Sequence, residues 1–540
     1  MLAQTTRIRP IHGALLAALL FFVAGQAFVP RTGVEADEAL PFVPLLAPKA
    51  AIYIRILGHN WPVLLMPYLG TLKSLIYKPL IGIFGDSLWT LREPVLVAGA
   101  ASILLFFLIL RRVSGELAAL IGCGLLATDS IYLLTVCYDW GPVALQHLLL
   151  LGGVLLILQF TENRRQLSLA AGFFLFGLAL WDKALSVWLL SSMGVACCLI
   201  FPRKILSLIT PRRLAIALVA FVLGAFPLIR YNLKTHWSTF RGNVNRDAQF
   251  YKKFPHLVYT LDGRGMFGFM MPFPGHDPPS PHPAADAITA TSDKISSLAG
   301  HPIRDWMLYA LAAALPLTLF ARGRDLRTIL FCLVVLVGGW LEMAITANAG
   351  ASVHHTILLW PLPQAIVAVS LAAASARLGR AGRPAVVVAA ALMISNALVM
   401  NEYYAVLHRD GGLMSWSAGI LRLSDYLKTA PPARVYCTDW GILEPLRYLN
   451  SGKLQLVNGT DPIVKPALDG EDQKRLEAAL DAPDQLVVMH TQEAEEFIGI
   501  RARLLRFAEE HGYNREVVAG ISDGFGRQMF EVCKFSRRAD

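Results

Sequence analysis

The residues of this chain best suited to chemistry are three acidic side chains that follow its first hydrophobic segment. Glu35, Asp37 and Glu38 come shortly after an apolar stretch near residues 13–29. Two arginines precede that stretch, and basic residues beside a membrane span mark its cytoplasmic end. The carboxylates therefore emerge on the other side of the membrane, where charge close to hydrocarbon is costly and usually functional. One of them can act as a general base, although the cluster can also simply cap a helix that begins near Ala39.

A second acidic candidate, Asp139, lies in the sequence Tyr138-Asp-Trp-Gly-Pro142. This sequence follows the third hydrophobic segment, so we expect it on the same face of the membrane as Asp37. Asp139 can cap the following helix, because proline is well suited to the first turn of a helix. Two acidic positions on one face can also share a cavity, with one accepting a proton and the other orienting substrate or binding metal.

Positively charged candidates lie in other connections on that face. Lys183 belongs to a very short turn, Arg230 follows a later span, and His354 and His355 begin another. Lysine and arginine at such positions either snorkel to the interface or bind a phosphate. Adjacent histidines point in different directions on a helix, so a phosphate contact or an interface pair is expected rather than one shared metal.

The composition predicts that membrane-spanning helices position these residues. The 540 residues are 55% hydrophobic and 16% charged, with a mean hydropathy of +0.49, which excludes an ordinary soluble protein. The net charge of +10 comes from basic residues between hydrophobic segments, which indicates topology rather than nucleic-acid binding. About eleven such segments lie near 13–29, 94–110, 115–135, 141–160, 168–181, 185–201, 213–229, 306–320, 328–346, 357–376 and 384–400.

The basic residues occur at alternate connections, all on the side of Arg7, which places two long loops outside the cytoplasm. The first loop, residues 30–93, is broken by prolines into pieces such as 70–84. These pieces look amphipathic, and we expect helices that lie along the interface. The second loop, residues 230–305, is rich in Pro, Gly, His and Asp. We expect it to lack a core and to be either mobile or a substrate lid.

The hydrophobic part, residues 1–400, is followed by a segment of different composition, residues 401–540, which predicts a small α/β domain. An odd number of spans places this domain on the same side as Asp37. Cys437 and Cys533 lie in strand-like runs and can form a disulfide if that compartment is oxidising. The patterns indicate strands at 434–438, 485–489 and 529–535 and helices at 471–480 and 493–511.

The chain contains no phosphate-binding loop, nucleophile elbow, zinc-protease motif or dinucleotide fingerprint. It resembles instead the GT-C glycosyltransferases, and most closely the bacterial, glycosyltransferase family 39-like branch related to protein O-mannosyltransferases and aminoarabinose transferase. The resemblance covers most of the first ten segments. It rests on Asp37 and Glu38 after the first segment, on Tyr68-Leu-Gly-Thr-Leu-Lys73, on the Asp139-Trp-Gly-Pro turn, and on the soluble C-terminal domain.

The resemblance implies an enzyme of the bacterial inner membrane that moves a sugar from a polyprenyl-phosphate carrier to a hydroxyl group outside the cytoplasm. The acceptor would be a glycolipid, a glycan or a protein. Asp37 would be the catalytic carboxylate and Asp139 a second residue of the acidic site, with Lys183 and Arg230 at the carrier phosphate. A base takes the acceptor proton while positive charge stabilises the departing phosphate, and a single displacement inverts the anomeric centre. A divalent cation held by carboxylate and histidine is an alternative source of that positive charge.

Two other functions fit the same location. A transporter or flippase of lipid-linked sugars predicts inverted repeats and broken helices, neither of which is clear in the sequence. A lipid-linked glycan ligase would use the same face of the membrane with a larger donor. The expected partners are the lipid-linked donor, the acceptor and membrane lipids, without nucleic acid. The identity of the sugar and of the acceptor, the carrier length and the need for metal are not determined by the sequence.

Overall fold

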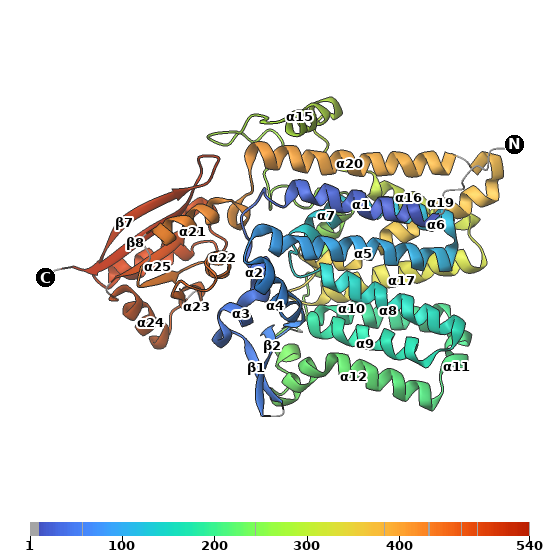
Figure 1. The fold of residues 1–540 in the computed structure, drawn as a ribbon, viewed down its shortest axis with the longest axis horizontal. Coiled ribbons are helices and arrows are strands. Elements are labelled where there is room, and N and C mark those ends of the chain that lie inside the picture. The colour runs from blue at the N-terminus through green and yellow to red at the C-terminus, as the bar shows by residue number, and fades with distance from the viewer. Residues whose placement is uncertain are drawn as a thin grey trace.

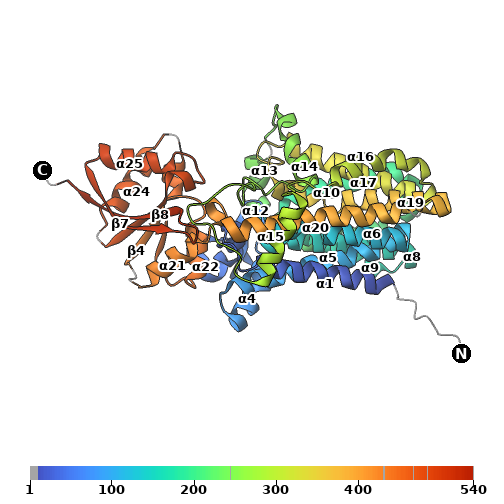
Figure 2. The same ribbon diagram turned by 90° about the horizontal axis from the view of Figure 1, so that it is seen from above.

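A long bundle of apolar helices carries a smaller sheet-containing domain at one end (Figure 1, Figure 2). The computed structural model describes residues 10–538 except 57, 244, 383, 430–431, 466 and 483. Within these residues, seven segments are long and apolar enough to cross a membrane. They are α1 (Pro10–Phe28), α5 (Leu88–Ser114), α8 (Ala144–Asn163), α12 (Pro211–Lys234), α17 (Gly323–Ile345), α18 (Val353–Thr356) together with α19 (Leu362–Leu378), and α20 (Pro384–Asp410).

Bent helix pairs and shorter helices complete the bundle. Each of the eleven predicted segments contains one of these elements, so the polytopic α-helical fold is confirmed, with seven to nine crossings by length and composition in the part described. The bent pairs are α6 (Glu116–Ala127) with α7 (Ser130–Cys137), at 60°, and η3 (Ala184–Ser186) and α10 (Val187–Ile200) with α11 (Pro202–Leu208), at 104°. The shorter apolar helices are α9 (Gln166–Asp182) and α16 (Met307–Leu317).

The break between α6 and α7 has a local cause in Asp129. Its Oδ1 accepts the backbone N–H of Tyr132 at 2.8 Å and so begins a new helix. Its Oδ2 accepts the indole N–H of Trp360 at 2.7 Å, which satisfies the buried carboxylate. The second helix of the pair ends at Cys137, and it therefore delivers the turn that carries Asp139 to the outer end of the bundle.

The first long loop folds against that outer end. It contains α2 (Ala36–Ala39) and α3 (Val43–Leu46), then an antiparallel sheet, and finally α4 (Leu72–Phe84). The helix expected at 70–84 is present as α4, whereas the sheet was not predicted. Its strands, in spatial order, are β1 (Ile52–Ile56), β2 (His59–Met66) and β3 (Leu69–Gly70).

The second long loop does not lack a core, which corrects the expectation from its composition. It contains α13 (Ser238–Asn243), α14 (Phe254–Leu261) and α15 (Ala287–Ala299). Between α14 and α15, Met266, Phe267, Met270 and Met271 are buried in the main apolar cluster of the bundle. The apolar residues are few, but they are adjacent in sequence, and a short run of this kind can anchor a loop that is otherwise polar.

The last part of the chain forms a five-stranded mixed sheet with helices on its two faces (Figure 1). The predicted strands and helices are present, while β5 and the first strand of the final hairpin were not predicted. The boundary expected at residue 401 falls inside α20, which continues to Asp410. The elements are α21 (Gly419–Thr429), β4 (Arg434–Cys437), α22 (Leu443–Leu449), β5 (Leu456–Asn458), α23 (Thr460–Val464), α24 (Gly470–Leu480), β6 (Gln485–His490), α25 (Ile500–Glu510), β7 (Tyr513–Ser522) and β8 (Gln528–Arg537), with strand order β5-β4-β6-β8-β7.

Cys437 and Cys533 do not form the disulfide considered from the sequence. Both thiols are free and buried. Cys437 is on β4 and Cys533 on β8, and β6 lies between these strands. Two strand spacings amount to roughly 10 Å, beyond the reach of about 7 Å between Cα atoms that a disulfide allows.

The sheet domain rests on the first long loop. The Tyr448 hydroxyl on α22 donates to the Ser87 carbonyl at 2.8 Å, and Ser451 donates to Asp86. The backbone N–H of Gly33 donates to the Trp416 carbonyl at 3.1 Å, just before the acidic cluster. The C-terminal domain therefore covers the end of the bundle where the candidate residues lie.

Candidate active site

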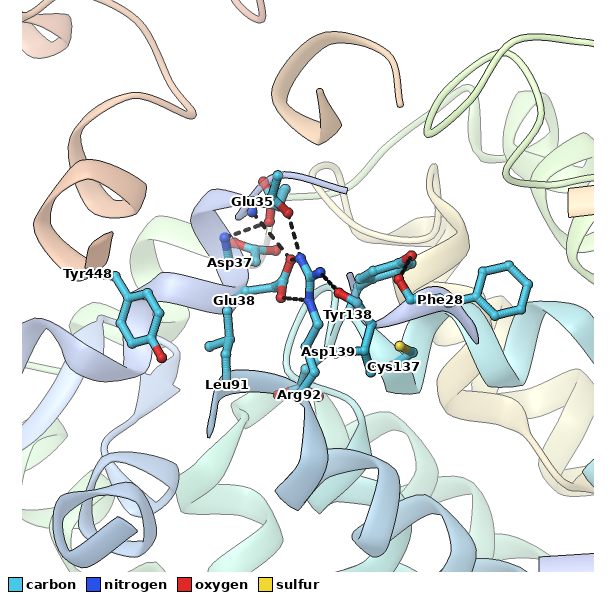
Figure 3. A network of polar contacts seen from close by, with 12 residues as sticks. Phe28, Glu35, Asp37, Glu38, Leu91, Arg92, Cys137, Tyr138, Asp139 and Tyr448 are labelled. Carbon is cyan, nitrogen blue, oxygen red and sulfur yellow. Dashed lines mark hydrogen bonds and ion pairs between the residues drawn. The ribbon is translucent and has the colours of Figure 1, made fainter. Parts of the chain in front are cut away.

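The acidic cluster forms a single helical turn, α2, with reciprocal capping at its start. The Glu35 carboxylate accepts the Asp37 N–H at 2.6 Å, and the Glu38 carboxylate accepts the Glu35 N–H at 3.3 Å (Figure 3). This arrangement is a capping box with acidic residues at both positions. The cap weighed from the sequence was for a helix beginning near Ala39; the structure instead has a capped helix that ends at Ala39, and its cap is made by Glu35 and Glu38, which leaves Asp37 available.

Glu38 is occupied by an ion pair with Arg92 on α5. The Arg92 Nε and Nη2 atoms donate to the two Glu38 oxygens, each at 2.8 Å, and both side chains are almost fully buried (Figure 3). Arg92 also donates to the carbonyls of Val29 and Gly33. A bidentate buried pair of this kind has fixed geometry. It attaches α2 to α5, and both oxygens of Glu38 are engaged in holding the turn.

Asp37 is the member of the cluster that reaches accessible surface, because its side chain is half-buried while Glu35 and Glu38 are buried. Its Oδ2 accepts the Gly141 N–H at 3.1 Å, and its Oδ1 accepts no hydrogen bond from the described residues. Burial raises the pKa of the Asp37 carboxyl above its usual value, and the nearby Lys183 cation opposes that rise. A carboxylate with a raised pKa and one free oxygen is suited to accept a proton.

Asp139 has both of the roles weighed from the sequence. Its Oδ1 accepts the N–H groups of Val143 and Ala144, each at 2.9 Å, and so caps α8. Its Oδ2 forms a buried ion pair with Lys73 of α4. The turn thus joins a membrane helix to the first loop and brings a second cation to the site.

Lys183 lies just after α9 and donates from Nζ to the Gly141 carbonyl. The N–H of the same residue, Gly141, donates to Asp37, so Asp37 and Lys183 are brought together at the turn after Asp139. Burial lowers the pKa of the Lys183 ammonium to about 8, against the opposing effect of Asp37. The turn of Lys183 is fixed by the Ala184 N–H, which donates to the Tyr68 carbonyl at 2.9 Å.

The two histidines lie beside the same turn, whereas Arg230 makes no polar contact with it among the described residues. The His354 ring packs on Trp140 with 4.5 Å between centroids, and the His355 ring lies 4.1 Å from His354. Nδ1 of His354 hydrogen-bonds Ser352 Oγ at 2.8 Å. Arg230, near the outer end of α12, makes no hydrogen bond or ion pair with another described residue, so its role at a phosphate stays a prediction.

The described residues do not provide a ligand set for a divalent cation. They contain no group of three or more His, Cys, Asp and Glu side chains arranged to hold a metal. Both carboxylate oxygens of Asp139 accept hydrogen bonds, from backbone amides and from Lys73. One oxygen of Asp37 accepts a hydrogen bond from Gly141. The cations that the structure places beside these two carboxylates are Lys73 and Lys183.

Sequence reasoning assigned no role to two cations, Lys73 and Arg92, which the structure places beside the carboxylates. Lys73 ends the quoted sequence that begins at Tyr68, and its burial beside Asp139 could not be read from that sequence. Arg92 stands just before the second hydrophobic segment. The helix α5 begins at Leu88, earlier than the segment predicted at 94–110, so Arg92 was counted in the first loop. An arginine directly before an apolar segment on the predicted outer side is the signal that could have identified it.

Comparisons with known proteins support the class of this fold. Residues 72–228 match a family model described as dolichyl-phosphate-mannose-protein mannosyltransferase. The structure superimposes on ArnT from Cupriavidus metallidurans bound to undecaprenyl phosphate, with a TM-score of 0.58, 14% identity and 97% of each chain covered. This chain has a GT-C fold. The fold predicted from the sequence is thereby confirmed, and glycosyltransferase activity remains a proposal.

The same fold occurs in two archaeal structures. The Archaeoglobus fulgidus oligosaccharyltransferase in the apo form has a TM-score of 0.51 and 12% identity, over 97% of this chain and 75% of that one. AglB from Archaeoglobus fulgidus, in complex with an inhibitory peptide and a dolichol-phosphate, has a TM-score of 0.53 and 11% identity, over 99% and 75%. No curated protein sequence matches the chain. At these identities the structures of the GT-C proteins support the fold and do not identify a substrate.

Proposed function

We propose that this GT-C protein transfers a sugar from a polyprenyl-phosphate donor to a hydroxyl acceptor on the extracytoplasmic face of the bacterial inner membrane. The observation that carries the proposal is the Asp37 carboxylate. It is half-buried, its pKa is raised, and its Oδ1 is free while Oδ2 is fixed by Gly141. These are the properties of a positioned base rather than of a structural ion pair.

In the proposed step, the acceptor oxygen attacks the anomeric carbon of the donor sugar. The bond between that carbon and the phosphate oxygen breaks, and its electron pair leaves with the polyprenyl phosphate. Asp37 accepts the proton of the acceptor hydroxyl as the new bond forms. A single displacement of this kind inverts the anomeric centre.

The lysines are placed to stabilise the departing phosphate. Lys183 binds the carbonyl of Gly141, the residue whose N–H binds Asp37, and Lys73 pairs with Asp139 two residues earlier. Both ammonium groups are buried, where a fixed charge acts more strongly than it would in water. His354 and His355 border this region and are candidates for further phosphate contacts.

The carrier class is supported by the lipids bound in structures of the same fold. ArnT is bound to undecaprenyl phosphate, AglB is in complex with a dolichol-phosphate and an inhibitory peptide, and the matching family model concerns dolichyl-phosphate-mannose. All three involve a polyprenyl or dolichyl phosphate, which we propose as the carrier. The proposed acceptor is a glycolipid, a glycan or a protein.

The function is tested with the purified protein and a panel of defined polyprenyl-phosphate sugars. We expect acceptor-dependent loss of the donor and stoichiometric release of polyprenyl phosphate. Asp37→Asn should abolish this release, whereas Asp425→Asn, on the exposed surface of α21, should not. Movement of labelled donor across a vesicle membrane without release of lipid phosphate would instead identify a flippase.

A further inference from the structure

Phe269, in the second long loop, is an exposed aromatic side chain that contacts the turn of the candidate site. Around it, Met266, Phe267, Met270 and Met271 are at most 5% exposed, whereas Phe269 is 37% exposed. The segment is held by backbone hydrogen bonds, because Gly268 donates to Met271 at 2.7 Å and Leu413 donates to Met270 at 2.8 Å. Further bonds join Tyr403 to the carbonyl of Gly263 and to the N–H of Met266. A loop fixed in this way presents Phe269 in a defined position.

Phe269 stacks on Trp140, in the turn that carries the candidate catalytic groups. The ring centroids are 4.6 Å apart and the planes differ by 22°. His354 packs on the same indole at 4.5 Å. Trp140 immediately precedes Gly141, whose peptide binds Asp37 and Lys183. We call Phe269, Trp140 and His354 the aromatic shelf.

The aromatic shelf lies beneath the C-terminal domain and is not part of an interfacial aromatic belt. Trp416, in the segment that leads into that domain, packs on Trp140 at 5.8 Å and on Phe269 at 6.4 Å. The anchoring bond from Leu413 comes from the same segment. A belt residue would face lipid, whereas these contacts face the junction between the bundle and the sheet domain.

Trp140 is only 6% exposed, so Phe269 is the accessible ring of the shelf and Trp140 supports it from below. We propose that the aromatic shelf binds the ring of a pyranose substrate on Phe269 and so determines which sugars reach Asp37. The inference rests on the proposed function and extends it to the recognition of the sugar. The C–H groups on one face of a pyranose carry partial positive charge and pack on the negative face of an aromatic ring. Nε2 of His354 makes no hydrogen bond with a described residue, which leaves a polar group for a ring hydroxyl.

Polar groups around the shelf favour a sugar over an acyl chain. An acyl chain seated there would bury Nε2 of His354 without offering it a hydrogen-bond partner, which is costly. A sugar offers hydroxyl groups at its edge and an apolar face below. The sugar ring belongs either to the donor or to a carbohydrate acceptor, and the chemistry of stacking is the same for both.

Binding is tested by saturation-transfer NMR on the purified full chain with a panel of methyl glycosides of hexoses and pentoses. We expect transfer to the C–H protons of one ring face in the wild type. Phe269→Ala should weaken the transfer roughly three- to tenfold, as expected for loss of one aromatic contact, and Phe269→Trp should restore it. Phe273→Ala is the matched control, because Phe273 is exposed in the same loop and stacks on Phe267. Equal transfer in the wild type and in Phe269→Ala, including none in both, overturns the proposal.

Turnover measurements distinguish the two sources of the sugar ring. With a polyprenyl-phosphate sugar and a carbohydrate acceptor, Phe269→Ala should raise the KM of one substrate and leave the other KM unchanged. A higher donor KM assigns the shelf to the donor, and a higher acceptor KM assigns it to the acceptor. Sugar binding that depends on Phe269 in a protein without transferase activity would refute the proposed function and leave the shelf as a binding site.

Discussion

At the scale of residues, one glycine links the groups that the sequence marked separately. Gly141 donates its N–H to Asp37 and accepts Lys183 at its carbonyl, and Asp139 lies two residues before it. A carboxylate for the proton and an ammonium for the phosphate are thereby held by the two backbone polar groups of one residue. Among the described residues Lys183 makes no hydrogen bond to Asp37, so Oδ1 of the carboxylate is left for substrate.

Replacement of Asp37 by asparagine should remove the base and preserve the fold. Turnover should fall by roughly two or more orders of magnitude, the usual effect of losing a positioned acid–base group. Thermal stability should change little, because the side chain is half-buried and asparagine can still accept the Gly141 N–H. Sugar-transfer assays and thermal unfolding in detergent measure the two effects. Near-normal transfer by a folded variant would make Asp139 the leading candidate for the base.

The pH profile should have two limbs that belong to Asp37 and Lys183. Asp37 must be ionised to accept a proton, so kcat/KM is lost as the pH falls through its raised pKa. Lys183 must be charged, so kcat/KM is lost as the pH rises through about 8. In Lys183→Met the limb near 8 should disappear, and the acidic limb should move to higher pH because a cation that lowers the pKa of Asp37 is gone. An acidic limb that does not move in Lys183→Met would show that Lys183 does not affect the pKa of Asp37.

Substitution of Lys183 by alanine should impair use of the donor more than use of the acceptor. The expected loss in kcat/KM for the donor is about tenfold or more, because the lysine stabilises the leaving phosphate. Arg230→Ala is the informative comparison, since Arg230 has no described polar contact at the site. A similar donor defect in Arg230→Ala would extend the phosphate site to α12, and unchanged donor kinetics in Lys183→Ala would reduce Lys183 to a structural role.

At the scale of elements, the four-residue helix α2 depends on α5. It is too short to be stable alone, because helix nucleation is unfavourable. Glu38 and Arg92 attach it to a membrane helix, and Phe42 packs edge-on against Tyr77 of α4 at 5.0 Å. The orientation of Asp37 is therefore a property of the packed loop and not of its own helical turn.

Replacement of Arg92 by methionine should destabilise the protein by about 3–5 kcal/mol, the cost of leaving a buried charge without its partner. The effect arises because Glu38 is 1% exposed and cannot be solvated by water. The double variant Arg92→Met with Glu38→Leu should recover much of this stability, since no unpaired charge remains. Thermal unfolding of the two variants measures the difference, and equal stability of both would contradict a charge-based account.

At the scale of the whole molecule, the C-terminal domain and the first loop enclose one end of the bundle (Figure 1, Figure 2). The contacts from Tyr448 to Ser87 and from Trp416 to Gly33 join the domain to the segments that flank α2. The basic connections predicted to be cytoplasmic belong to the other end. The candidate site and the basic connections thus lie at opposite ends of the bundle, which supports a site on the extracytoplasmic face.

Topology is tested by reporters fused to the C-terminus. We expect activity from an alkaline phosphatase fusion, which needs the extracytoplasmic compartment, and no fluorescence from a cytoplasm-dependent fluorescent protein. The reason is the alternation of basic connections along the bundle. Fusions after Arg112, at a predicted cytoplasmic connection, should give the opposite result and serve as the control. A C-terminus reported as cytoplasmic would overturn the location proposed for the site.

The sequence alone predicted three things: the membrane fold, the strand and helix patterns of the last domain, and the candidate acidic residues. Hydropathy and basic connections are local signals, because each span must satisfy its own backbone in lipid. Asp37 was identified because a carboxylate directly after a span is conspicuous. The buried run Met266 to Met271 was missed, because its polar and proline-rich surroundings resemble a loop without a core.

Only the tertiary structure decided which charged residues have structural roles and which are available for chemistry. Asp37 and Gly141 are 104 residues apart and Gly141 and Lys183 are 42 apart, so no local pattern relates them. Glu35, Asp37 and Glu38 look equivalent in the sequence, yet one caps α2, one pairs with Arg92 and one is left half-buried with a free oxygen. The assignment depends on which partner packing brings within hydrogen-bond distance, and that follows from the whole fold and not from the order of residues along the chain.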